Sequence, residues 1–305
     1  MDPGAQAEQR PWSTRLYGWI NRTFKYWALV PVLLVLVTMT LYPVMLLLRM
    51  SASEITFARG KMTWNLVGLD HLKEALADPV VPVALKNTAI FVLVVVTFET
   101  LLGFVAALAI SRTHRFNGGY RTILLTPILI PPIAIGVMWR LIYDFNYGLI
   151  STVLTAFQIQ GPTWTADPTL AMPSIMIVDV WHWTCFVFLI LLASLESLPP
   201  EALEAARVDG ASEWQVLGYV IVPLMRSTII LVVMLRAIMA SKVFDQIFLL
   251  TRGGPGTATQ VISLYIYEVF FVQFRLGYGA FLAVGTAILL SIVVISYLRF
   301  SRQAR

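Results

Sequence analysis

Four residues of this 305-residue chain have types and spacing that could bind a hydroxylated solute: Asp179, His182, Trp183 and Phe186. All four fall on one face if the segment is helical. A carboxylate and an imidazole can hold hydroxyl groups, and aromatic rings can pack on the face of a pyranose. The pattern therefore predicts one wall of a site for a sugar-like molecule.

A second polar group, Lys242, Asp245 and Gln246, has the spacing of one helix face in the next apolar segment. Ionisable residues inside such segments are costly and usually mark a solute path or a partner contact. An alternative stays open, since Lys242 and Asp245 at i and i+3 could simply neutralise each other. Glu99 and Arg236 lie near the centres of their segments and predict a structural ion pair.

The sequence offers no catalytic or metal-binding pattern. Its three histidines, His71, His114 and His182, lack metal-ligand spacing, and no G-x-x-x-x-G-K-[ST] run is present to hold ATP phosphates. The run 210–213, Gly-Ala-Ser-Glu, is not a nucleophile elbow. We therefore expect no catalysis, no metal and no cofactor in this chain, and an intramembrane enzyme is disfavoured.

The composition places these residues in a membrane protein. Hydrophobic residues make up 58% of the chain and charged ones only 13%, with a mean hydropathy of +0.77, whereas soluble domains have about 25% charged residues. Six stretches are long enough to cross a bilayer, and prolines 127, 131 and 132 predict that the third is bent or broken. The six predicted spans are 27–48, 88–110, 124–143, 173–195, 228–250 and 279–300.

The positive charges predict the orientation. With the N-terminus inside, the inner segments hold twelve Lys and Arg residues and the outer segments seven, which favours cytoplasmic termini. The apolar run 27–48 is too long for a signal-peptide core, so we expect it to be a retained span. The predicted organisation is a cytoplasmic N-terminal segment (1–26), a six-span membrane domain (27–300) and a cytoplasmic tail (301–305). The segments 49–87 and 144–172 are then outer loops, and membrane lipid rather than nucleic acid surrounds the chain.

The longest predicted cytoplasmic loop, 196–227, has the signals of two short helices. Pro199 and Pro200 suit a helix start, acidic residues at 201 and 204 suit its first turn, and Gly210 suits its end. Ser212 can cap a second helix that leads to Pro223. The small or apolar residues predicted to share one side of the first helix are Leu198, Ala202, Ala205 and Ala206. The pattern alone leaves open whether this loop meets a partner or lies on the membrane surface.

The same loop resembles the EAA loop of bacterial ABC importer permeases. The resemblance rests on Glu204-Ala205-Ala206, on Gly210 and on the run 220–223, Val-Ile-Val-Pro, at the family's spacing. Val220 and Val222 replace the usual Ile and Leu, and Ser227 lies near a proline often found in the family. The resemblance implies a coupling helix that docks on a cytoplasmic ATPase, with the docking residues Glu201, Glu204, Ala205, Ala206, Asp209 and Gly210.

A second resemblance narrows the class of importer. The run 244–251, Phe-Asp-Gln-Ile-Phe-Leu-Leu-Thr, followed by Gly253-Gly254-Pro255 and Thr259, is similar to carbohydrate-importer permeases of the maltose, glycerol-3-phosphate and sugar-alcohol type. Together the resemblances imply an all-α chain with six transmembrane helices and the type I ABC importer permease fold, in a bacterial inner membrane. The implied partners are a second permease subunit, two ATP-binding subunits that bind ATP and Mg, and an extracytoplasmic solute-binding protein.

Two other functions remain open at this point. An importer for a non-sugar solute would have the same coupling loop, and a solute found bound to the purified complex would distinguish it. An ion-coupled secondary transporter could use Glu99 and Asp179 at a midplane site, and transport abolished by an uncoupler but insensitive to ATP depletion would favour it. The sequence does not name the carbohydrate.

Overall fold

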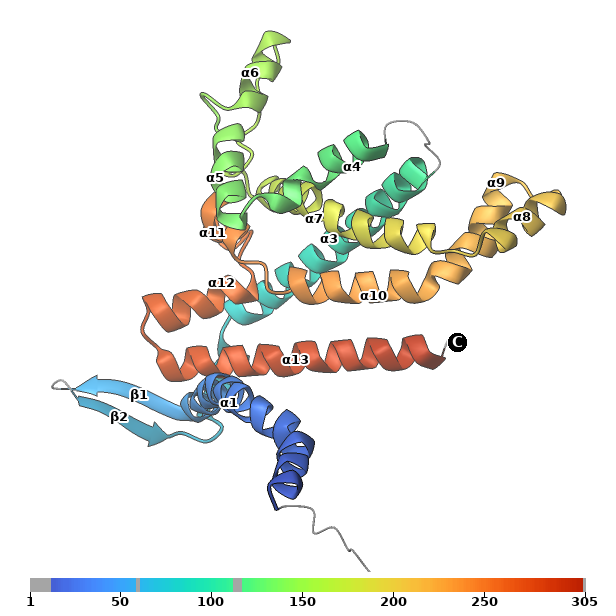
Figure 1. Ribbon diagram of the computed structural model, residues 1–305. Helices are drawn as coiled ribbons and strands as arrows, with labels where there is room; N and C mark the ends of the chain where they lie inside the picture. The colour runs from blue at the N-terminus through green and yellow to red at the C-terminus, as the bar shows by residue number, and fades with distance from the viewer. Residues whose placement is uncertain (1–11, 59–60, 112–116, 304–305) are drawn as a thin grey trace, which may run out of the picture.

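The computed structural model describes residues 12–58, 61–111 and 117–303 and is predominantly helical (Figure 1). The predicted segments 1–26 and 301–305 therefore lie partly outside the described residues. In chain order the elements before the middle of the chain are α1 (Trp12–Ser51), β1 (Ser53–Ala58), β2 (Lys61–Leu66), α2 (Asp70–Ala77), α3 (Val80–Ser111), α4 (Asn117–Leu125), the 3-10 helix η1 (Thr126–Leu129), α5 (Pro132–Ile142) and α6 (Leu149–Ala156). The later elements are α7 (Ala171–Glu196), α8 (Pro200–Val208), α9 (Glu213–Val216), the π-helix η2 (Leu217–Ile221), α10 (Val222–Ala240), α11 (Asp245–Leu250), α12 (Ile262–Tyr267), the π-helix η3 (Glu268–Val272) and α13 (Leu276–Gln303).

Five helices are long and apolar enough to cross a membrane, or six if one bent pair counts as a span. The five are Ala28–Ser51, Val80–Ser111, Ala171–Glu196, Glu213–Ala240 and Leu276–Arg299. The predicted first, second, fourth and sixth spans all coincide with these helices, apart from a few residues at their ends. The prediction of a polytopic, helical membrane chain is confirmed.

The predicted third span is broken, as its prolines indicated. Thr122–Leu129 and Pro132–Ile142 meet at an angle of 102°. Pro131 precedes Pro132, and a residue before proline is pushed out of the helical region, so Pro131 adopts ψ 140°. Proline also has no N–H to donate to the preceding turn. The helix therefore ends at Leu129 and restarts at Pro132 in a new direction.

The predicted fifth span, 228–250, is wrong at its C-terminal end. The helix runs from Glu213 to Ala240, and a break over 241–244 separates it from α11. The apolar run continues through 243–250, so hydropathy marks no end there, but Phe244 has φ −139° and ψ −59° and cannot continue a helix. Lys242 therefore does not share a helix face with Asp245, contrary to the prediction.

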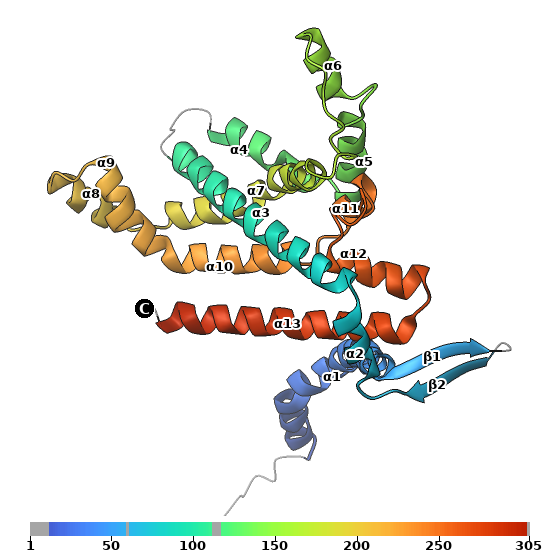
Figure 2. The ribbon, with the colours of Figure 1, turned by 180° about the vertical axis from the view of Figure 1, so that it is seen from behind.

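The core of the bundle lies between α3, α7 and α10, which run alongside one another (Figures 1 and 2). Apolar side chains of α3 and α7 pack along most of their length. Gly103 of α3 permits the close approach, because a Cβ there would lie 2.8 Å from the Val187 side chain and 2.9 Å from the Phe188 nitrogen. Small residues at helix crossings let membrane helices pack in this way. The packed helices hold the polar residues of the site in fixed positions.

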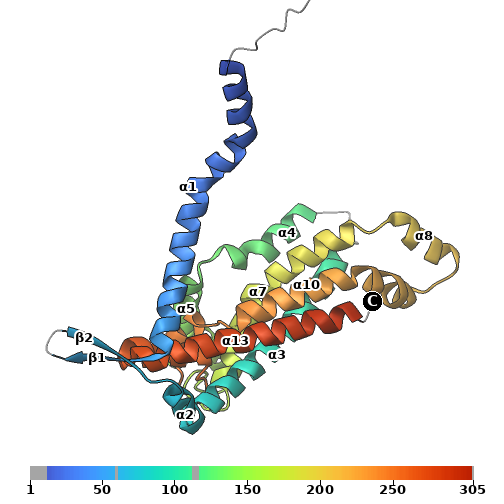
Figure 3. The same cartoon turned by 90° about the horizontal axis from the view of Figure 1, so that it is seen from below.

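The helix α1 and the hairpin lie apart from this core. The most apolar window of α1 has none of its residues buried, and Figure 3 shows α1 extending away from the other helices. The strands β1 and β2 form an antiparallel hairpin directly after α1, with Ser53 paired with Leu66. The hairpin was not predicted, since its segment was treated as an outer loop.

The two ends of the bundle differ. The α8–α9 loop and the C-terminal end of α13 lie at one end, and α2, the hairpin and the α12–α13 turn lie at the other (Figures 1 and 2). At the hairpin end, the Asp78 carboxylate accepts hydrogen bonds from the hydroxyls of Tyr265 at 2.5 Å and Tyr278 at 2.7 Å. Arg275 donates to the Glu74 carboxylate, which fixes α2 against the start of α13. These polar contacts tie α2 to the α12–α13 hairpin.

Candidate functional site

The loop between α7 and α10 is a helix, a sharp turn and a second helix, as its sequence predicted. The helix α8 begins at Pro200 with Glu201 in its first turn, where the helix dipole favours an acid. It ends at Val208, and Gly210 then adopts φ +80°, a left-handed conformation that glycine reaches without a steric cost. The glycine therefore sets the turn.

Ser212 starts the second helix through a capping box. The Gln215 backbone N–H donates to the Ser212 hydroxyl at 3.4 Å, and the Ser212 N–H donates to the Gln215 side-chain oxygen at 2.8 Å. From there α9, η2 and α10 continue as one helix to Ala240. The turn is thus joined directly to a helix of the bundle core.

The two faces of α8 are distinct. Leu203 and Ala206 pack against the apolar cluster between α3, α7 and α10, whereas Ala205 is exposed. The exposed predicted docking residues are Glu201, Glu204, Ala205, Asp209 and Gly210, with Ala206 half-buried. Beside them Val208 and Trp214 are 86% and 83% exposed. The outer face of this loop therefore combines acidic, small and apolar surface.

Three charged side chains meet in the core of the bundle. Arg236 of α10 donates from Nε to Glu99 Oε2 at 2.6 Å and from Nη2 to Glu99 Oε1 at 2.7 Å. Its Nη2 also donates to Asp179 Oδ2 of α7 at 2.9 Å. Each of the three residues is at most 2% exposed. The predicted Glu99–Arg236 ion pair is confirmed, and Asp179 is its unpredicted third member.

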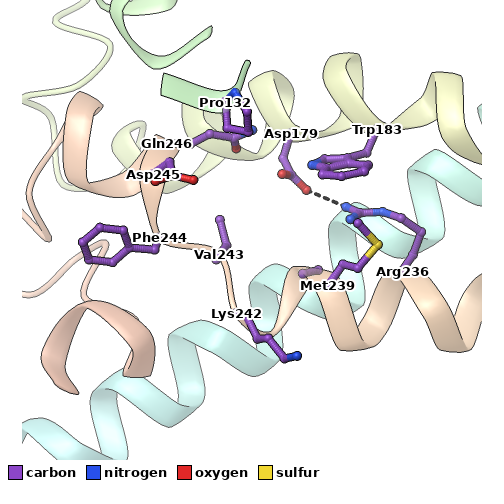
Figure 4. A pocket seen from close by; sticks show the side chains of 11 residues that line it. Pro132, Asp179, Trp183, Arg236, Met239, Lys242, Val243, Phe244, Asp245 and Gln246 are labelled. Atoms are coloured by element: carbon purple, nitrogen blue, oxygen red, sulfur yellow. Dashed lines mark hydrogen bonds and ion pairs between the residues drawn. The ribbon is translucent and has the colours of Figure 1, made fainter. Parts of the chain in front are cut away.

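Two members of this cluster, Asp179 and Arg236, line a cavity of about 120 Å³ (Figure 4). The guanidinium carbon of Arg236 lies 4.7 Å from the centre of the Trp183 ring. Five of the seven predicted solute-binding residues line the cavity, and Pro132 brings α5 against it. The lining residues are Pro132, Asp179, Trp183, Arg236, Met239, Ala240, Lys242, Val243, Phe244, Asp245 and Gln246.

The break in the fifth span is what places Asp245 and Gln246 at this cavity. Since α11 starts after the break, it packs mainly against α5 rather than continuing α10. Gln246 is 3% exposed, and its side-chain oxygen has no hydrogen-bond partner among the described residues. A buried, unpaired oxygen is unusual in folded proteins. Sequence reasoning missed Phe244 and Pro132 as lining residues, although the prolines of the third span had marked that region as irregular.

His182 and Phe186 are not among the lining residues. The His182 ring is 2% exposed and lies 4.8 Å from Trp183, and its Nδ1 lacks a hydrogen-bond partner within the described part of the chain. Phe186 packs edge-on against the Trp183 ring at 6.0 Å. Both side chains therefore support Trp183, and a direct contact with solute stays a prediction.

The glycine-rich turn after α11 is anchored to α3. Asn87 Nδ2 donates to the carbonyl oxygens of Thr257 at 3.0 Å and Gln260 at 2.9 Å, with Ala258 at 3.4 Å. The Ile262 N–H donates to the Thr88 hydroxyl at 3.0 Å. The turn is therefore fixed to the bundle rather than free in solution.

Comparison with known proteins identifies a family for most of the chain. The family described as "Binding-protein-dependent transport system inner membrane component" matches residues 99–305. The trehalose/maltose transport system permease protein MalF of Thermococcus litoralis is 33% identical over 92% of this chain and 94% of its own length. The sulfoquinovosyl glycerol transport system permease protein SmoG of Agrobacterium fabrum is 28% identical over 97% of this chain and 96% of its own.

A solved structure has the same fold. One chain of a bacterial ABC transporter involved in the import of the acidic polysaccharide alginate superposes with a TM-score of 0.81. The match covers 95% of this chain and 99% of the other at 22% identity. The arrangement of α3, α7, α10 and α13 is therefore that of a type I ABC importer permease, as the sequence predicted.

Proposed function

The chain belongs to the family of binding-protein-dependent transport system inner membrane components, and from this membership we propose that it is the carbohydrate-conducting permease subunit of an ATP-driven importer. The loop 196–227 is the observation that carries the proposal. Its turn at Gly210, its capping box and its exposed acidic face present a surface at one end of the bundle. The loop is joined through α10 to the cavity, so a force on the loop has a direct route to the solute path.

The energy source is a separate ATPase in this proposal. We expect two ATP-binding subunits to hold ATP and Mg, and α8 to dock on one of them through Glu201, Glu204, Ala205, Ala206, Asp209 and Gly210. The small residues would let another backbone come close, while the carboxylates at 201 and 204 stay hydrated. A second permease subunit, expected to be a paralogue, would supply the other half of the path, and an extracytoplasmic solute-binding protein would deliver the solute.

The orientation proposed is that both termini are cytoplasmic. The α8–α9 loop and the C-terminal end of α13 lie at the same end of the bundle, which agrees with the predicted topology (Figure 1). The positive-inside rule supports a cytoplasmic position for this end. The hairpin and α2 would face the outside, where the solute-binding protein arrives.

The carbohydrate class rests on the relatives and on the cavity. Two similar permeases are named for trehalose/maltose and for sulfoquinovosyl glycerol. The cavity combines Trp183 and Phe244 with carboxylates and an amide, which are the groups that hold sugar rings and hydroxyls. The solute would pass this wall as the complex alternates between inward- and outward-facing states.

The test is uptake by the complete complex in proteoliposomes, with its binding protein outside and ATP enclosed. We expect ATP-dependent accumulation of a neutral disaccharide such as trehalose or maltose, with ATPase activity stimulated by the loaded binding protein. Transport that survives without ATP but collapses with an uncoupler would instead identify an ion-coupled transporter. Transport of an amino acid or an inorganic oxyanion, with every carbohydrate rejected, would retain the importer but refute the carbohydrate class.

A further inference from the structure

The cavity beside α7 and α11 presents mostly hydrogen-bond acceptors. Asp179 and Asp245 contribute carboxylates, and Gln246 contributes a buried side-chain oxygen that has no partner within the described residues. An unpaired buried oxygen costs free energy. A solute that donates a hydrogen bond to this oxygen would remove that cost.

The two positive charges at the cavity do not offset these acceptors. Arg236 donates its Nε and Nη2 hydrogens to Glu99 and Asp179, so its charge is already balanced by two carboxylates. Lys242 is exposed, and Figure 4 shows its side chain pointing away from Asp245 and Gln246. No salt bridge joins Lys242 to a residue in the described part of the chain. Lys242 is therefore the lining cation whose charge is not already balanced by a salt bridge, but its side chain lies apart from the acceptors of Asp245 and Gln246.

The formal charges lead to the same result. Among the lining residues, the two carboxylates of Asp179 and Asp245 match the two cations Arg236 and Lys242, and Arg236 also binds Glu99. A sulfonate, phosphate or carboxylate group entering here would therefore meet no excess of positive charge. Such a group also has only acceptor oxygens when ionised, so it could not satisfy the Gln246 oxygen.

We propose that this half of the solute path selects neutral, hydroxyl-rich carbohydrates and disfavours carbohydrates that carry an anionic group. The inference rests on the proposed function and narrows its substrate class. Asp245 and Gln246 are the specificity-determining residues: Gln246 accepts a hydrogen bond from a solute hydroxyl, and Asp245 accepts one while repelling anions. Trp183 and Phe244 offer ring surfaces that do not depend on solute charge. The preference is therefore expected to follow the solute's charge rather than its size.

The test compares two solutes that differ in one group. Glucosylglycerol has a hydroxyl at the sixth carbon of its glucose ring, where sulfoquinovosyl glycerol has a sulfonate. Binding of each is measured by calorimetry to the purified complex of both permeases and the ATP-binding subunits, without the solute-binding protein, so that the specificity of that protein does not enter. Trehalose and maltose extend the neutral set, and an alginate oligosaccharide extends the anionic set. We expect the neutral solutes to bind at least about tenfold more tightly than the anionic ones.

Variants assign the preference to the two residues. Asp245→Asn removes a charge at constant volume and should reduce the preference for neutral over anionic solutes by roughly threefold or more. Gln246→Leu should weaken binding of the neutral solutes by up to about tenfold and leave the weak anion binding unchanged. Asp70→Asn is the matched control, because Asp70 is an exposed acid on α2, which lies at the hairpin end (Figure 2). This control variant should leave the ratio of neutral to anionic solute affinity unchanged.

The outcomes separate this inference from the proposed function. Equal or tighter binding of the sulfonate by the wild-type complex would overturn the selection of neutral solutes while leaving a carbohydrate importer in place. A neutral preference that Asp245→Asn and Gln246→Leu both leave intact would remove the two residues from specificity. Failure of every carbohydrate in both sets to bind or to be taken up would refute the carbohydrate class itself.

Discussion

Arg236 holds Glu99 by two hydrogen bonds, of 2.6 Å from Nε and 2.7 Å from Nη2, where both side chains are fully buried. The pair joins α10 to α3, and the bond from Nη2 to Asp179 adds α7. Buried ion pairs contribute little net stability, because desolvation offsets their attraction. Removing one partner, however, leaves a buried charge without compensation. The charged cluster therefore joins three helices, and the cost of removing one of its side chains depends on which charges are left unpaired.

Arg236→Met should be the most damaging single change in this cluster, because it strands two buried carboxylates. A loss of roughly 3–5 kcal/mol is expected when a buried charge pair is broken in this way. Glu99→Ala should cost less, since the Arg236–Asp179 pair survives, and Asp179→Asn should cost least. Thermal unfolding of the purified complex measures the order. The triple variant Glu99→Gln, Asp179→Asn, Arg236→Met should recover most of the loss, and an Arg236→Met complex as stable as wild type would contradict the account.

Gly210 tests the coupling loop by its backbone conformation. Its φ of +80° disfavours residues with a Cβ, and a Cβ there would meet no atom within 4 Å, so the effect of a substitution is conformational rather than steric. Gly210→Val should strain the turn by about 1–2 kcal/mol and lower both recovery of the ATPase subunits and solute-stimulated ATP hydrolysis. Gly210→Asn should be milder, because asparagine tolerates this region. If valine and asparagine behave alike and both couple normally, the turn does not set the docking geometry.

Asn87 tests how the glycine-rich turn is anchored. Its amide donates to carbonyl oxygens of the segment 257–260. Asn87→Ala removes those donors, whereas Asn87→Asp also places carboxylate oxygens against the carbonyl oxygens. Hydrogen exchange of the segment 252–261 should therefore increase in the order wild type, alanine, aspartate. Aspartate giving the same protection as asparagine would show that the amide is not the anchor.

Asp78 predicts a pH dependence at the hairpin end. Partial burial acts to raise the pKa of its carboxyl, but hydrogen bonds from Tyr265 and Tyr278 and from backbone N–H groups outweigh it, and the net pKa is lowered below its ordinary value of 3.8. A carboxyl whose pKa is lower in the folded state stabilises the fold above its unfolded pKa, and this contribution is lost as the pH falls through the folded pKa. The melting temperature of wild type minus that of Asp78→Asn should be constant from about pH 7 to 5 and should shrink below about pH 4. A difference that does not change down to about pH 3 would contradict the lowered pKa.

Local sequence signals predicted the coupling loop well. A helix start at Pro200, a left-handed turn at Gly210 and a cap at Ser212 each depend on neighbours within a few residues, and each is found in the structure. The proline break of the third span is local in the same way. Such features need no knowledge of the tertiary fold.

The cavity could not be predicted to the same extent, because it depends on contacts between distant segments. The sequence marked Glu99 and Arg236 as partners, yet only the packing of α7 against α3 brings Asp179 to the same guanidinium. The end of α10 was missed because the apolar run continues past Ala240. Hydropathy indicates whether a segment lies in lipid or in water, but not where its backbone changes direction. It therefore gave no signal for the hairpin that follows α1.

The continuous helix from Glu213 to Ala240 has a mechanical consequence. At 1.5 Å per residue, its 28 residues make a rod of about 42 Å, with the capping box near one tip and Arg236 near the other. Because a hydrogen-bonded helix resists compression along its axis, we expect a displacement of the capped tip to reach Arg236. The π-turn at 217–221 interrupts the regular α-helical hydrogen bonding of this rod. We therefore expect bending to concentrate next to the loop, and the half of the rod that holds Arg236 to move as one piece.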